Sequence, residues 1–335
     1  MSVYRRTLTK EAIDLIAFLE QHLLKQPIIS VRQFAHGSAS QNYHVTLDNQ
    51  RELLVKLTHA YDEQGIARLA QICQAVSDNH QLPVARLIPI NKKPYFQYQN
   101  RFGLIMEYCQ GHAVASYNLT EQHFMQIIDA YAVFTNTSWP KEDVFIPLYP
   151  LKEQCLTHMN FIQETLNKTS HINTVKKYLL TKIGNAHLTF FERLLETTVN
   201  LPLNKQTIIH GDFHNNNVLF HHNQLVSFLD FEEVGHGYII EDIMRFILCV
   251  VQRLPIFINP YPLIRCWVKC ADDKFRFSKE EWILGLNSYY VQRADKAFRS
   301  KYKTGSWHQI IIWTKLLWLT RRYHKIKQWI EQTHV

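Results

Sequence analysis

Residues 210–217 read His-Gly-Asp-Phe-His-Asn-Asn-Asn and follow a short strand-like segment at residues 207–209. Two more strand-like segments, at residues 218–220 and 225–229, come next and flank a turn signal at His222-Asn223. This pattern predicts a β-hairpin that begins after Asn217 and ends before Asp230. Because a hairpin brings its two ends together, we expect Asn217 and Asp230 to be neighbours.

An amide and a carboxylate at the open end of such a hairpin form a set of hard oxygen ligands. Asn217 and Asp230 therefore suit Mg²⁺ that holds the phosphates of a nucleotide. Asp212, shortly before Asn217, would then be free to orient and deprotonate an attacking hydroxyl. Phosphoryl transfer requires this combination of positioning, charge neutralisation by a metal, and an orienting carboxylate.

A lysine in an apolar strand is the next candidate. Residues 53–57 read Leu-Leu-Val-Lys-Leu, so Lys56 has apolar neighbours on both sides. An unpaired buried ammonium is costly, which predicts a partner for Lys56. The phosphates of a nucleotide are one such partner, and Glu63, from a helix predicted over residues 62–76, is another.

Two further segments are candidates for nucleotide contacts. Residues 37–42 read Gly-Ser-Ala-Ser-Gln-Asn and form a small polar loop, in which the backbone N–H groups of Gly37 and Ser38 are placed to cover phosphates. Residues 104–109 read Leu-Ile-Met-Glu-Tyr-Cys and are apolar until the chain opens toward Gly111. The backbone groups in this second segment are candidates to pair with an adenine edge; they belong to Glu107, Tyr108 and Cys109.

The periodicity of the chain changes after Gly111. Before it we expect a helix over residues 9–25 and the helix over 62–76, with strands over residues 28–34, 43–47, 52–57, 84–90 and 102–107. After it, helical patterns dominate residues 120–200 and 238–335, with a Ser306 cap before the last helix. The sequence thus predicts an α+β, two-lobed fold. A small, mostly antiparallel β-sheet with one inserted helix occupies residues 1–107, the nucleotide-binding lobe, and a large, mainly helical catalytic and substrate-binding lobe occupies residues 108–335.

These segments together resemble a known family. His-Gly-Asp-x4-Asn at 210–217 looks like the catalytic loop of the aminoglycoside phosphotransferase and choline kinase-like enzymes, distant relatives of the protein kinases. Leu-Asp-Phe-Glu at 229–232 looks like their metal-binding segment, and Met-Glu-Tyr at 106–108 looks like their hinge. Leu-Pro-Val at 82–84 and Glu-Asp-Ile at 241–243 resemble further segments of the family, so that the resemblance covers about residues 30–250.

The resemblance implies a protein kinase-like fold and a role for each candidate residue. Asp212 is then the catalytic base, and Asn217 and Asp230 are the Mg²⁺ ligands. Lys56 binds the phosphates and Glu63 orients it. The remaining implied roles are support of the catalytic loop by His210 and Asp242.

The expected activity is ATP-dependent transfer of the γ-phosphate to a hydroxyl of a small molecule, such as a sugar, an amino alcohol or an aminoglycoside-like compound. A protein Ser/Thr kinase on the same scaffold is one alternative, and a catalytically silent nucleotide-binding interaction module is another. The complete set of Lys56, Asp212, Asn217 and Asp230 favours an active enzyme with ATP and Mg²⁺ as cofactors.

The composition of the chain limits where the protein can reside and which partners it can bind. The chain has no N-terminal apolar stretch and no run long enough to span a membrane, and its six cysteines form no CxxC pair. We therefore expect a cytoplasmic protein with reduced thiols. The formal net charge of +8 is typical of solvated basic helix faces, so we expect no nucleic-acid partner and mildly favour a neutral or anionic acceptor. Weak peripheral contact of the basic, Trp-rich last helix with an anionic membrane is an alternative to its packing in the core; the sequence leaves the oligomeric state open.

Two competing motifs are disfavoured. His210 and His214 are spaced to share a metal only on a helix, whereas their segment has the pattern of a loop, which argues against zinc. Residues 235–237, Gly-His-Gly, lack the third glycine and the strand-to-helix context of a dinucleotide fingerprint.

Overall fold

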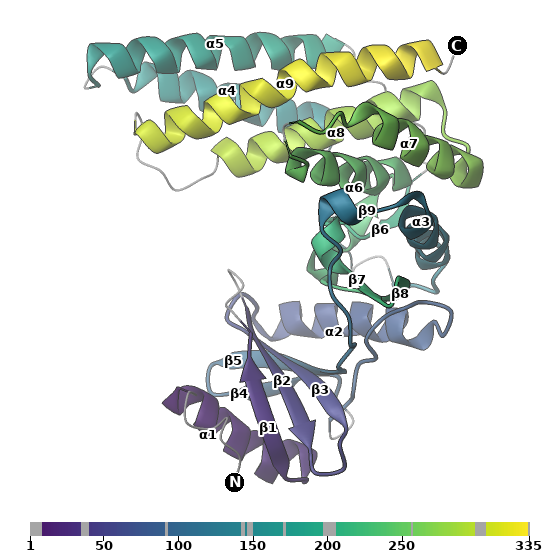
Figure 1. Cartoon of the computed structure of the whole chain (residues 1–335). Coiled ribbons are helices and arrows are strands. Elements are labelled where there is room, and N and C mark those ends of the chain that lie inside the picture. Colours follow the sequence, from purple (N-terminus) through teal and green to yellow (C-terminus); the bar gives the residue numbers. More distant parts are fainter. Residues whose placement is uncertain are drawn as a thin grey trace. The chain divides into compact units, whose positions relative to one another are not determined.

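The computed structural model describes residues 9–34, 40–90, 93–141, 145, 150–169, 172–196, 206–255, 257–298 and 306–333 of the chain (Figure 1). The chain divides into two compact units. Unit 1 comprises Met1–Ile146 and Asn215–Val234, and unit 2 comprises Pro147–His214 and Gly235–Val335. Unit 1 therefore continues past residue 107, and a functional lobe boundary at that residue stays a prediction.

Unit 1 begins with a five-stranded sheet in the order β1-β2-β3-β5-β4, in which all neighbouring strands are antiparallel (Figure 1). The strands are Ile28–Gln33 (β1), Ser40–Leu47 (β2), Glu52–Thr58 (β3), Phe96–Tyr98 (β4) and Arg101–Glu107 (β5). All except β4 follow the apolar segments expected from the sequence. The β4 strand has only three residues, too few to show an alternating pattern.

The N-terminal helix shares its core with the sheet. Helix α1 (Lys10–Phe18) continues directly into the π-helical turn η2 (Leu19–Leu24). Leu15 of α1 is buried in one cluster with Val55 of β3. Because side chains alternate along a strand, the neighbouring Lys56 points to the opposite face of the sheet.

The predicted helix after β3 is present as α2 (Glu63–Asp78). Asp62 caps it, because its carboxylate accepts a hydrogen bond of 2.8 Å from the Gly65 N–H. The segment at residues 84–90, expected as a strand, forms only isolated bridges. Pro89 has no N–H to continue a ladder, although the Ile88 N–H still donates to the Ile105 carbonyl of β5 at 2.8 Å.

The predicted hairpin belongs to unit 1 and packs against helix α3. The elements here are η3 (Ser116–Asn118), α3 (Glu121–Thr135), η6 (Asn215–Asn217), β7 (Val218–His221), β8 (Gln224–Phe228) and η7 (Phe231–Glu233). His222 and Asn223 have positive φ angles of 48° and 60°, the two-residue turn that matches the twist of a hairpin. Gln126 of α3 holds this turn, since its amide donates to the Asn223 carbonyl at 3.0 Å and accepts from the Leu225 N–H at 2.9 Å.

Unit 2 is mainly helical. Its elements are α4 (Leu151–Asn167), α5 (Thr174–Glu196), β6 (Thr207–Ile209), β9 (Gly235–Gly237), α6 (Ile239–Arg253), α7 (Tyr261–Phe275), α8 (Lys279–Phe298) and α9 (Trp307–Thr333). Strands β6 and β9 pair antiparallel. Within the described ranges, no helix combines the length and the apolar character that crossing a bilayer requires.

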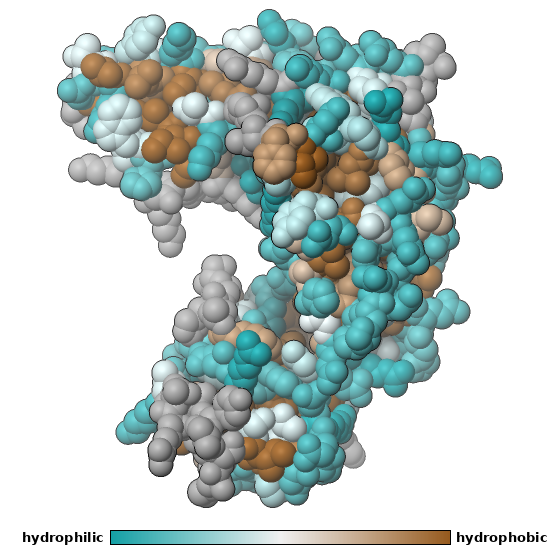
Figure 2. All heavy atoms as spheres, viewed as in Figure 1, coloured by the Kyte–Doolittle hydropathy of each residue, from teal (hydrophilic) through white to brown (hydrophobic). Residues whose placement is uncertain are grey.

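The last helix contributes to the core of unit 2 and also reaches its surface. Trp313 of α9 is fully buried and contacts Phe298 of α8 edge to face, whereas Trp307 is half exposed. Apolar side chains also reach the surface of the long helices of this unit (Figure 2), among them Tyr178 of α5. Core packing therefore accounts for Trp313, and contact of this helix with a membrane stays a prediction.

A buried histidine in unit 2 makes stability depend on pH. The His187 ring of α5 is fully buried, and its Nε2 donates to the Trp313 carbonyl at 2.9 Å. Burial lowers the pKa of His187 from 6.5 to about 4, against the smaller opposing effect of that hydrogen bond. The unfolded chain therefore takes up a proton first as the pH falls. We expect the stabilising contribution of neutral His187 to be complete above about pH 6.5 and to be lost toward about pH 4.

Urea unfolding at a series of pH values tests this expectation. Wild-type protein should lose more unfolding free energy between about pH 6.5 and 4 than His187→Gln, because glutamine can donate to the same carbonyl but does not titrate. Equal losses in the two proteins would assign the acid sensitivity to other groups.

Candidate active site

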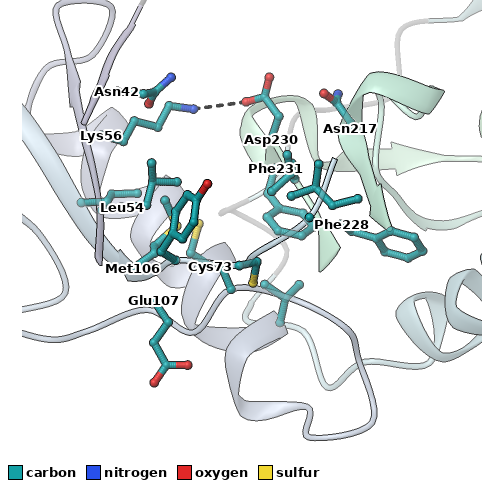
Figure 3. A pocket seen from close by; sticks show the side chains of 18 of the residues that line it. Asn42, Leu54, Lys56, Cys73, Met106, Glu107, Asn217, Phe228, Asp230 and Phe231 are labelled. Carbon is teal, nitrogen blue, oxygen red and sulfur yellow. Dashed lines mark hydrogen bonds and ion pairs between the residues drawn. The ribbon is translucent and has the colours of Figure 1, made fainter. Parts of the chain in front are cut away.

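Lys56 forms a close cluster with two carboxylates of unit 1. Its Nζ lies 3.2 Å from Asp230 Oδ1 and also forms an ion pair with Glu232 (Figure 3 shows the first contact). The Lys56 side chain is only 14% exposed. Burial favours a lower pKa for this ammonium, but the two carboxylates outweigh burial and raise the pKa of Lys56 above its usual value. Lys56 is therefore a charged side chain that two carboxylates hold on the cavity-facing side of β3.

The structure does not place Glu63, the residue expected to orient Lys56, beside this lysine. Glu63 is the first residue of α2, and its carboxylate accepts a hydrogen bond of 3.1 Å from the Tyr95 hydroxyl. The chain between β3 and α2 is so short that Glu63 falls at the exposed start of the helix. The carboxylates that meet the ammonium come instead from the segment after β8, at Asp230 and Glu232.

Asn217 and Asp230 lie at the open end of the hairpin, as its topology predicts. The Leu229 N–H donates to the Asn217 carbonyl at 2.9 Å, which closes the hairpin next to both residues. Both side chains line the same cavity (Figure 3). Asp230 has a positive φ of 65°, a backbone conformation that aspartate and asparagine tolerate better than most residues. An amide and a carboxylate, the kinds of oxygen ligand that suit a hard cation, thus line one cavity.

These residues form the polar end of a cavity of about 360 Å³ that lies entirely in unit 1. The volume is within the range of small-molecule sites. Apolar side chains make most of the remaining wall, namely Leu54, Leu69, Val76, Ala85, Leu104, Met106, Leu219, Phe228 and Phe231. A mainly apolar cavity with a few charged groups at one end suits a ligand that carries a flat apolar part and an anionic part.

Glu107, Tyr108 and Cys109 also line the cavity. The Tyr108 ring stacks on His44 with ring centroids 3.8 Å apart, and the Tyr108 N–H donates to the Glu52 carbonyl at 3.1 Å. The Glu107 side chain points away from the cavity (Figure 3). The Glu107 N–H donates to the Arg86 carbonyl at 2.8 Å. Gly37 and Ser38, which were predicted to cover the phosphates, lie outside the residues that the structure describes.

Asp212 belongs to unit 2, and the side chains of Arg245 and His214 contact its carboxylate. Arg245 of α6 donates from Nη1 to Asp212 Oδ1 at 3.1 Å, and His214 Nε2 lies 3.4 Å from Asp212 Oδ2. Arg245 is itself tethered, since its other terminal nitrogen donates to Gln292 of α8. Arg245 was not among the site residues predicted from the sequence. The sequence feature that could have indicated Arg245 is its spacing from Asp242, which puts Asp242 and Arg245 on one face of α6.

Asp242 holds the backbone of the same loop. One of its carboxylate oxygens accepts from the His210 N–H at 2.6 Å, and the Gly211 N–H donates to both oxygens at 3.2 Å. Both His210 and Asp242 are buried. Phe213 anchors the loop further, because it is fully buried against His210 and Phe246. Helix α6 thus fixes both the backbone of the loop and, through Arg245, the Asp212 carboxylate.

A family model for the phosphotransferase enzyme family matches residues 30–259, more than half of the chain. The chain belongs to this family. The predictions of the family and of a phosphotransferase with an alcohol group as acceptor are thereby confirmed. No curated protein matches the chain in sequence.

Solved structures of other phosphotransferases share the fold. A spectinomycin phosphotransferase in complex with ADP and spectinomycin is 15% identical, with a TM-score of 0.67, and the match covers 92% of this chain and 95% of that one. An amicoumacin kinase with AMP-PNP and Ca²⁺ is 14% identical, with a TM-score of 0.62 and coverages of 93% and 94%. Choline kinase from Cryptosporidium parvum is 15% identical, with a TM-score of 0.61 and coverages of 95% and 97%. The predicted two-lobed, protein kinase-like fold is confirmed.

Two of these solved structures contain bound nucleotides. ADP or AMP-PNP is bound in two of the relatives, one of them together with a divalent cation. That ATP and Mg²⁺ serve as the cofactors of this chain stays a prediction. The chemistry of the cavity fits both groups, because Lys56 supplies a cation for phosphates and Asn217 with Asp230 supplies oxygen ligands for a metal.

Proposed function

We propose that the protein transfers the γ-phosphoryl group of ATP to a hydroxyl of a small-molecule acceptor, with Asp212 as the catalytic carboxylate. The observation that carries the proposal is the polar end of the cavity in unit 1. There Lys56, Asn217 and Asp230 line one space next to an apolar chamber of nucleotide size. This set of groups matches what a Mg-nucleotide requires.

On the donor side, Lys56 would bind the α- and β-phosphates, and Asn217 and Asp230 would hold Mg²⁺. The metal supplies neutralisation of the charge on the transferring phosphoryl group. The adenine would occupy the apolar part of the cavity, where its edge would pair with the Glu107 carbonyl and the backbone of Cys109; the Glu107 N–H already donates to the Arg86 carbonyl at 2.8 Å. Glu107 contributes through its backbone, since its side chain points away.

On the acceptor side, the hydroxyl oxygen attacks the γ-phosphorus while the bond from phosphorus to the β–γ bridging oxygen breaks, so that ADP leaves. Asp212 orients the hydroxyl and accepts its proton. Arg245 and His214 fix the two carboxylate oxygens of Asp212, and Asp242 fixes the loop that carries it. Positioning of this kind is the main contribution that a protein makes to phosphoryl transfer.

The acceptor class is a sugar, an amino alcohol or an aminoglycoside-like compound. The names of the solved relatives, which include a spectinomycin phosphotransferase and a choline kinase, support an acceptor with an alcohol group. The formal charge of +8 favours a neutral or anionic member of this class.

The test uses the full chain with Mg-ATP and a panel of choline, ethanolamine, spectinomycin, an aminoglycoside, neutral sugars and sugar phosphates. We expect ADP release that depends on one acceptor class and on Mg²⁺, with the phosphorylated acceptor identified by mass spectrometry. Label transfer from ATP to protein substrates but to no small molecule would favour a protein Ser/Thr kinase. Nucleotide binding without any transfer would favour a silent interaction module.

A further inference from the structure

Glu232 lies two positions after Asp230, in η7, and contacts the same ammonium. Lys56 forms ion pairs with both carboxylates, but the two acids differ in their surroundings. The Asp230 side chain is 45% exposed, whereas the Glu232 side chain is 18% exposed. The Glu232 contact is therefore the more enclosed of the two.

Two further hydrogen bonds fix Glu232, one at its side chain and one at its backbone. The Tyr61 hydroxyl donates to its second carboxylate oxygen, Oε2, at 3.0 Å. Arg68 of α2 donates from Nη2 to the Glu232 carbonyl at 3.0 Å. The side chain and the backbone of Glu232 are thus both tied to the segment that follows β3. Held in this way, the carboxylate stays beside Lys56 without depending on Asp230.

The proposed chemistry separates the tasks of the two acids. Asp230 is placed to bind the metal, and a carboxylate that coordinates Mg²⁺ has less charge to offer an ammonium. Lys56 must nevertheless keep its direction on the cavity-facing side of β3 to meet the phosphates. A buried ammonium needs a permanent acceptor for this purpose, and Glu232 is the acceptor that remains.

We propose that Glu232 is the positioning residue for Lys56, in the role that the sequence pattern assigned to Glu63 of the helix. The proposal rests on the proposed function, because it concerns the lysine that would bind the donor phosphates. Glu232 acts through Lys56 and needs no contact with the nucleotide.

Variants of Glu232 and Glu63 test which of these two carboxylates positions Lys56. Glu232→Gln keeps the shape of the side chain and an acceptor for Tyr61 but removes the charge. We expect kcat/KM for ATP to fall by about 10- to 100-fold, the range typical when a supporting partner of a site residue is lost. Glu63→Gln, which alters the carboxylate that meets Tyr95, should stay within about twofold of wild type, as should the matched control Glu233→Gln at an exposed position of the same turn.

A double-mutant cycle distinguishes positioning from a general structural effect. If Glu232 acts through Lys56, then Glu232→Gln should cost little more once Lys56→Met has removed the ammonium. Urea unfolding of each variant checks that the fold is retained, and Glu232→Asp should recover part of the lost activity. Additive losses in the cycle, or a larger loss in Glu63→Gln than in Glu232→Gln, would overturn the proposal. A wild-type protein that neither binds nor turns over Mg-ATP would contradict the proposed function itself, whereas an active wild type with a fully active Glu232→Gln contradicts only the role of Glu232.

Discussion

Asp212→Asn is expected to lower kcat by about 10²–10⁴-fold, the contribution of a general base in proton transfer. Asparagine has the same shape and can still accept a hydrogen bond from Arg245, so the loop should keep its conformation. It cannot take a proton from the acceptor hydroxyl. The affinity for Mg-nucleotide should stay near that of wild type, because the proposed donor contacts all come from unit 1. Initial rates with a saturating acceptor, together with calorimetric titration of Mg-AMP-PNP, measure the two quantities separately.

Asp273→Asn provides the matched control, since Asp273 is an exposed acid of α7 in the same unit. Its kcat should equal that of wild type. Unchanged turnover in Asp212→Asn would show that another group orients the acceptor. A large loss of nucleotide affinity in that variant would show that Asp212 acts in donor binding instead.

Asp230→Asn is expected to reduce kcat on the order of 10²–10³-fold at ordinary Mg²⁺ concentrations, as when one preorganised electrostatic contact to the transferring group is removed. Asparagine tolerates the positive φ of 65° at this position, so the backbone of the hairpin end should persist. Lys56 also keeps Glu232 as a partner. The effect should therefore come from the metal: the Mg²⁺ concentration that gives half-maximal rate at fixed ATP should rise.

An exposed acid of α1 in the same unit, Asp14, gives the comparison variant Asp14→Asn, which should keep the Mg²⁺ dependence of wild type. The rate of each protein is measured against free Mg²⁺. If Asp230→Asn showed the same half-maximal concentration as wild type, Asp230 would not be a metal ligand.

Local pattern predicted the elements that carry the candidate site. The apolar run at residues 53–57 predicted the strand that carries Lys56. The structure then places this side chain on the face opposite the core cluster, because strand side chains alternate. The turn residues His222-Asn223 placed Asn217 and Asp230 at one end of a hairpin. A hairpin and a strand are short-range features, so the sequence contains most of what determines them.

Contacts between distant segments could not be predicted in the same way. Glu232 meets Lys56 only because the hairpin packs beside the sheet, and no local pattern encodes that approach. Glu63 was the nearer acid in the sequence, yet the position of the α2 cap directed it to Tyr95. Arg245 is a comparable case, since its contact with Asp212 depends on how α6 packs against the loop after β6.

The separation of tasks between the units bears on how such an enzyme diversifies. Lys56, Asn217 and Asp230 belong to one compact unit, although a long stretch of chain lies between the first and the other two. If these residues bind the phosphate donor and its metal as proposed, substitutions in the helices of the other unit would leave the donor site unchanged. We expect selection for a new acceptor to leave the donor cavity intact and to act on α4, α5 and α7 to α9. Enzymes that descend from one ancestor would then share their phosphate donor and differ in their acceptor substrate.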